Sequence, residues 1–83
     1  MKEIHIGEII NSKCREQKIL CKELGESINR SREAARDIML KPHINTSVLL
    51  SISKALHYNF FKDLAAYTDK LLNENNDSQE KNS

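Results

Sequence analysis

Apolar residues recur at intervals of three and four along most of this chain, which restricts it to short amphipathic helices. The first stretch shows this plainly, since Ile6, Ile9, Ile10 and Cys14 fall on one helix face. The same spacing predicts five helices, at about 6–17, 21–28, 32–40, 47–56 and 60–72. Only two Gly and one Pro interrupt the 83 residues, too few for the turns of a β-rich fold. We therefore expect an all-α fold, a compact five-helix bundle forming one domain over 1–72.

The last segment, 73–83, contains no apolar side chain. Such a segment buries too little surface to offset the entropy of ordering, so we expect a disordered polar tail. No apolar run approaches the roughly 20 residues of a membrane span, and the N-terminus lacks a secretory signal. A cytoplasmic protein without membrane contact is therefore the expectation.

Two cysteines, Cys14 and Cys21, lie seven positions apart, without a Cys-x-x-Cys pair. This spacing favours reduced thiols in packing roles over a disulfide framework. A metal site combining them with His43 and His57 is the less favoured alternative, and we expect no metal and no cofactor. The sequence has no Gly-rich phosphate loop and no catalytic set of side chains, so we expect no enzyme and no evident small-molecule ligand.

Charge is distributed unevenly, although the net charge is only +1. The stretch 13–41 holds eight Lys or Arg against five Asp or Glu. This local excess permits a surface that faces phosphates, but it does not require one.

A helix, a three-residue break and a second helix occupy 21–40. Leu24 and Ile28 are expected to pack on Ala35 and Ile38, and the small Gly25 predicts the close approach of another helix. Further residues fall in register with this pair: Ile6-Gly7, Ile10, Ile19, Ser31, Ile44-Asn45-Thr46, Leu49, Ile52, Leu56 and Phe60-Phe61. In this register, residues 6–64 resemble the lambda-repressor-like helix-turn-helix domains of the Xre/Cro type. The similarity is greatest to a short subgroup associated with Bacteroidetes bacteria.

This resemblance implies sequence-specific binding of double-stranded DNA through the major groove, and a role as a transcriptional regulator. It places five residues of the second helix and its cap toward DNA: Ser31, Arg32, Glu33, Arg36 and Asp37. We expect Lys22, Arg30 and Lys41 to meet phosphates. Chemically, Arg32 can donate to guanine O6 and N7, and Glu33 can accept from cytosine N4. The two carboxylates on this face also favour an alternative, a helix-turn-helix fold used as a protein-interaction module without DNA binding.

The chain departs from the family pattern at two places. Leu20 and Cys21 stand where the family has a polar cap and often a Gln near a phosphate. Cys14 and Met39 stand where an Arg–Glu ion pair is common, so we expect these two apolar side chains to touch inside the domain.

A homodimer is expected, because one recognition helix reads only a few base pairs and specificity usually requires two half-sites. The predicted contact is the second half of the last helix, with Tyr67, Thr68, Leu71 and Leu72. In the alternative, these residues fold back onto the first helix and cover Ile4 and Ile9.

Overall fold

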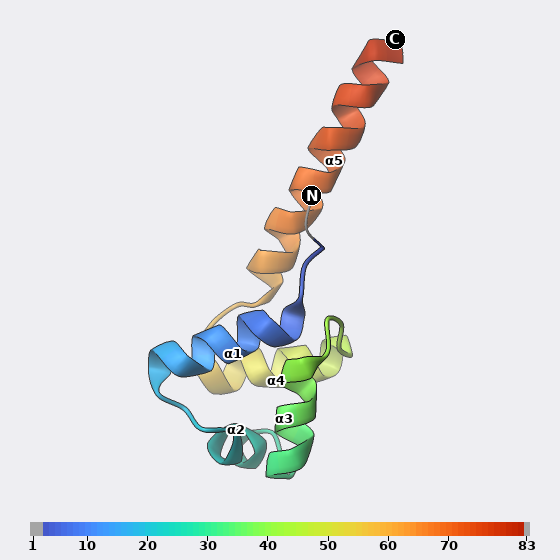
Figure 1. The fold of residues 1–83 in the computed structure, drawn as a ribbon. Helices are drawn as coiled ribbons and strands as arrows, with labels where there is room; N and C mark the ends of the chain where they lie inside the picture. Colours follow the sequence, from blue (N-terminus) through green and yellow to red (C-terminus); the bar gives the residue numbers. More distant parts are fainter. Residues whose placement is uncertain (1–2, 83) are drawn as a thin grey trace.

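The computed structural model describes the backbone of residues 3–82 and the side chains of residues 3–74. Within this part the chain forms five α-helices and no strand: α1 (Ile6–Gln17), α2 (Cys21–Ser27), α3 (Arg32–Leu40), α4 (Thr46–Leu56) and α5 (Phe61–Asn82) (Figure 1). The all-α prediction is confirmed, and the first four helices lie within one residue of their predicted bounds. No helix of the described residues combines the length and apolarity needed to cross a membrane.

Helix α1 begins where the chain docks onto the loop that follows α3. The His5 imidazole accepts a hydrogen bond from the Glu8 N–H, which caps the helix. The Ile6 and Gly7 N–H groups donate to the carbonyls of Pro42 and Lys41, each at 2.9 Å. These bonds satisfy amides that a helix start leaves without internal partners. Gly7 permits this approach, since a Cβ there would lie 2.6 Å from the Lys41 carbonyl oxygen.

The α2–α3 pair is joined by a turn that only small or adaptable residues allow. The Arg30 N–H donates to the Gly25 carbonyl at 2.7 Å, and Asn29 adopts a left-handed conformation with φ 59°. A Cβ on Gly25 would lie 2.7 Å from the Arg30 carbonyl oxygen. The close approach predicted at Gly25 is therefore real, but the turn backbone makes it rather than another helix. Ser31 caps α3 by accepting from the Ala34 N–H at 3.1 Å.

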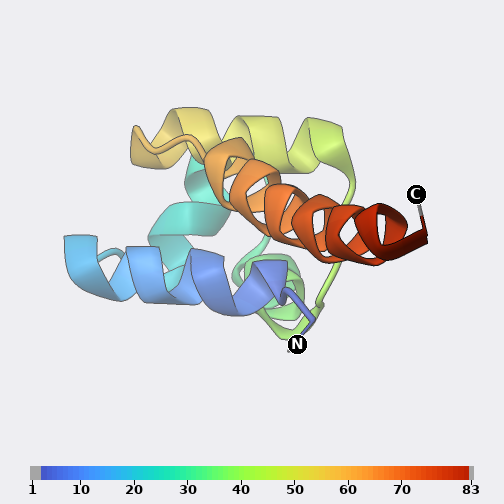
Figure 2. The same ribbon diagram turned by 90° about the horizontal axis from the view of Figure 1, so that it is seen from above.

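The core lies where all five helices meet. Its buried members are Ile6, Ile10, Cys14, Leu24, Ala35, Ile38, Leu49, Ile52, Leu56 and Phe60. Seen from above in Figure 2, α5 starts near the end of α4 and passes over the body as it leaves it, and Phe61 and Leu64 at its start pack against this cluster. The apolar stripes predicted from the spacing are thus the faces that the helices bury.

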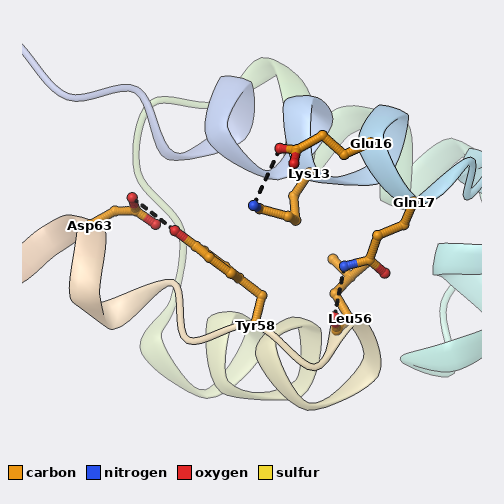
Figure 3. Close-up of polar contacts among 6 residues, drawn as sticks. All are labelled: Lys13, Glu16, Gln17, Leu56, Tyr58 and Asp63. Carbon is orange, nitrogen blue, oxygen red and sulfur yellow. Dashed lines mark hydrogen bonds and ion pairs between the residues drawn. The ribbon is translucent and has the colours of Figure 1, made fainter.

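Polar contacts join α1 to the junction between α4 and α5 (Figure 3). The Gln17 amide donates to the Leu56 carbonyl at 2.8 Å, beside the end of α4. The Lys13 ammonium lies 4.1 Å from the centroid of the Tyr58 ring, within the range of a cation–π contact. The Tyr58 hydroxyl donates to the Asp63 carboxylate at 3.2 Å, and this hydrogen bond is the main cause that raises the pKa of Tyr58.

Helix α5 differs from its prediction, which ended it near 72 and left 73–83 disordered. Its backbone stays helical through Asn82, and residue 83 lies outside the described residues. The segment contains neither Gly nor Pro, and four of its eleven residues (two Glu, one Gln and one Lys) are good helix formers, whereas the others are Asn, Asp and Ser. Because extending a helix costs much less than starting one, even such a polar segment can continue it. The predicted helix end near 72 is therefore corrected to Asn82.

Candidate nucleic-acid interface

The outer face of α3 is solvent-exposed along its whole length. All eight residues predicted to meet DNA have exposed side chains: Lys22, Arg30, Ser31, Arg32, Glu33, Arg36, Asp37 and Lys41. Ala35 and Ile38 point into the core, which turns the opposite side of the helix outward. The structure thus leaves all eight groups accessible to a partner.

A basic hollow of about 600 Å³ runs along one side of α3, where α2 begins and α1 passes. Lys22, Arg32 and Arg36 bring three positive charges to it. The remaining lining residues are Asn11, Leu20, Cys21, Met39 and Leu40. We call this surface the α2–α3 hollow. It gathers Lys22 and two arginines that are predicted to face DNA around one concave surface.

A second basic hollow, of about 330 Å³, lies where α3 ends and α4 begins. Arg30, Lys41 and His43 line it together with Asn45 and three apolar residues. Asn45 accepts from the Ser47 N–H at 2.7 Å, and the first turn of α4 contains no acidic residue. We call this surface the α3–α4 hollow. It combines cationic side chains with the positive end of an eleven-residue helix.

The two hollows lie on opposite sides of α3. At 100° per residue, Arg32 and Arg36 point to one side of the helix and Ile38 and Lys41 to the other. Glu33 and Asp37 point between these two directions, along the exposed line of α3 that we call the crest. The acidic groups therefore lie on the crest, and the basic groups lie on its two sides.

The crest carboxylate of Asp37 is paired with a neighbouring cation. Its oxygen lies 3.0 Å from the Lys41 ammonium one helical turn later, and both side chains are more than half exposed. Exposed pairs of this kind contribute little to stability, so Lys41 can exchange Asp37 for another anion at low cost. His43 similarly contacts the Glu3 carboxylate at 3.1 Å, at an exposed position.

Both cysteines are free thiols, Cys14 on α1 and Cys21 at the start of α2. Cys14 is buried, and this burial is the main cause that raises the pKa of its thiol. The charge of Cys21 raises the pKa further. Cys21 is half-buried, with its Sγ 3.7 Å from the Met39 Sδ. Met39 packs against the core cluster that contains Cys14, but its sulfur contacts Cys21. The predicted touch of Cys14 and Met39 stays a prediction.

The four residues predicted for a dimer contact do not share one environment. Tyr67 is half-buried beside a small groove that Ile4 and Ile9 also line, as the fold-back alternative expected. The Thr68 hydroxyl donates to the Leu64 carbonyl within α5 at 2.7 Å. Leu71 and Leu72 are 38% and 51% exposed. Within the described residues, the exposed apolar part of the predicted contact is thus confined to these two leucines.

Four residues that line the hollows are not among the eight predicted DNA contacts. Leu20 and Leu40 are 68% and 69% exposed and border the α2–α3 hollow. His43 and Asn45 reach the α3–α4 hollow only because the loop folds back toward Arg30. For Leu40 a signal existed, since the helical period turns it away from Ala35 and Ile38.

Comparison with family models, with curated proteins and with solved structures finds no match for this chain.

Proposed function

We propose that the protein binds double-stranded DNA, with the α2–α3 pair acting as a helix-turn-helix and α3 as the helix that enters the major groove. The two basic hollows on opposite sides of the exposed α3 carry this proposal. A helix lying in the major groove has a phosphate backbone on each side of it, so cations are needed on both flanks. A transcriptional regulator of the lambda-repressor-like kind is the function that fits this arrangement best.

The proposal divides the exposed groups between bases and phosphates. Arg32, in the first turn of α3, would donate to a guanine edge, while Glu33 on the crest would accept from cytosine N4. Lys22 and Arg36 would meet one strand, and Arg30, Lys41 and His43 would meet the other. The phosphate of that second strand replaces Asp37 as the partner of Lys41.

Fluorescence anisotropy with a panel of labelled genomic and random duplexes tests the proposal. About four phosphate contacts per subunit predict a log-log slope of affinity against salt near −3 to −4 for each bound copy. Arg32→Ala should weaken binding by about 1–3 kcal/mol and relax the preference at one base pair. Lys41→Ala should weaken all duplexes alike and reduce the salt slope by about one. Lys62→Ala, an exposed change at the start of α5, is the matched control and should leave binding unchanged.

A second candidate function is a protein-interaction module that uses the same face. The carboxylates of Glu33 and Asp37 on the crest of α3, together with the exposed Leu20 and Leu40, favour it. If no duplex binds even at low salt, the DNA proposal fails and this candidate takes its place.

A homodimer is part of the DNA proposal, because two half-sites extend the sequence that one recognition helix reads. Leu71 and Leu72 support the homodimer, because they are exposed on a helix that projects from the body (Figure 1).

A further inference from the structure

Two exposed leucines border the α2–α3 hollow, and the DNA proposal gives them no role. Leu20 immediately precedes α2 and Leu40 is the last residue of α3, and their side chains are 68% and 69% exposed. The half-buried Cys21 and Met39 line the same hollow. Single exposed leucines are ordinary on protein surfaces, whereas several apolar side chains around one concave surface are typical of an interaction site.

The same hollow also contains three cations without an acidic partner. Lys22, Arg32 and Arg36 line it, and no Asp or Glu does. Among the residues that the structure describes, none of these three cations forms an ion pair. The hollow is therefore positively charged as well as partly apolar.

Cationic and apolar groups follow one another along α3. Arg32, Arg36 and Leu40 are spaced by four residues, so they lie on one side of the helix over about 12 Å. A partner helix laid along this row would meet it over about two of its own turns, with side chains spaced by three and four residues. Acidic residues on that helix would face the two arginines, and an apolar residue further along it would face Leu40.

From this arrangement, we propose that the α2–α3 hollow is a docking site for an acidic amphipathic helix of a partner protein. Phosphates complement the three cations but not the two leucines, whereas such a helix complements both. The helix would cover Lys22 and Arg36, to which the DNA proposal assigns phosphates, so helix and duplex would exclude each other. This competition rests on the proposed function, but the docking itself does not.

The test uses the full-length protein and a panel of fluorescein-labelled peptides of about 15 residues, long enough to form a helix. Each peptide carries Leu, Ile or Phe at helical spacing on one face, with Glu on both sides of that face. Fluorescence anisotropy should show saturable binding that weakens as salt is added, because the three cations contribute to it. A shuffled peptide of the same composition, without an apolar face, should bind about tenfold more weakly or not at all. The unlabelled amphipathic peptide should displace a labelled duplex from the protein.

Variants of the two leucines locate the docking site. Leu40→Ser removes apolar surface that docking would bury, and it should weaken peptide binding about tenfold. Leu20→Ser should have a similar effect and should keep the fold, because serine is a preferred residue at this cap position of α2. Leu50→Ser is the matched control: Leu50 is 62% exposed on α4, outside the hollow, and this variant should bind the peptide as wild type does.

The proposal is overturned if the amphipathic and shuffled peptides bind alike, or if both leucine variants bind as tightly as wild type. It is also overturned if Leu20→Ser and Leu40→Ser convert a dimeric wild type into a monomer in light scattering, since a second copy would then fill the hollow. A peptide that binds without displacing the duplex would refute the competition. Because peptide binding is measured without DNA, its success or failure is distinguishable from that of the proposed function.

Discussion

Replacing Gly7 with alanine perturbs the point at which α1 docks onto the loop after α3. The added methyl group would lie 2.6 Å from the Lys41 carbonyl oxygen and would also collide with the Met39 carbonyl. Both neighbours are backbone atoms, so the strain cannot be relieved by a side-chain rotation. Two hydrogen bonds, from the Ile6 and Gly7 amides to this loop, would lengthen as the segments separate.

The expected loss of stability follows from these contacts. Overpacking of a tight site costs about 1–3 kcal/mol, and two weakened hydrogen bonds add about 1 kcal/mol. Alanine has a higher helix propensity than glycine, which stabilises a helix interior by up to about 1 kcal/mol. The gain is smaller at the second position of a helix. We expect a net loss of about 2–3 kcal/mol, a large part of the roughly 5 kcal/mol of so small a domain.

Urea unfolding followed by circular dichroism measures this loss as a lower midpoint with an unchanged slope. Ser12→Ala is the matched control, because it lies exposed on the same helix and should change stability by no more than about 0.5 kcal/mol. If Gly7→Ala unfolds at the same or a higher urea concentration than wild type, the docking of α1 on this loop is not as close as described.

Four further changes test other contacts. Ser31→Ala removes the cap of α3 and should lower the free energy of unfolding by about 1 kcal/mol in the same assay; an unchanged midpoint would show that the cap contributes nothing. Cys14→Arg should destabilise strongly, because it buries an unpaired charge, and a fully stable variant would contradict the burial of this position. The raised pKa of Tyr58 favours the neutral phenol in the folded state, so stability should fall as pH rises above 10.0, and Tyr58→Phe should lose less over that interval. Leu71→Asp with Leu72→Asp should halve the mass measured by light scattering and weaken DNA binding while the fold survives; a wild type that is monomeric at high concentration would refute the dimer.

The helices and the core were predictable because their signals are local. The spacing of Ile6, Ile10 and Cys14 identified the buried face of α1, and Ser31 marked the start of α3. For α4 the segment 45–47 offered a choice of caps, of which the structure uses Asn45. Such signals depend on neighbours in the chain, which a sequence shows directly.

The surfaces between helices were not predictable in the same way. The α3–α4 hollow exists because the chain brings Arg30 to the loop that carries His43, and no local pattern reports that approach. For the same reason, the contact of the Cys21 and Met39 sulfurs depends on how α2 crosses α3. At Gly25 the spacing indicated a close neighbour but not its identity, which proved to be the turn backbone.

The direction in which α5 leaves the body restricts how two copies can share one duplex. In Figure 1 this helix projects away from the end of the molecule where α2 and α3 lie. A dimer joined through α5 would hold its contact away from its two α2–α3 pairs. The molecule is 22 Å across, whereas successive half-sites are about 34 Å apart. The angle at which the two α5 helices cross would therefore set whether both α3 helices reach the same duplex.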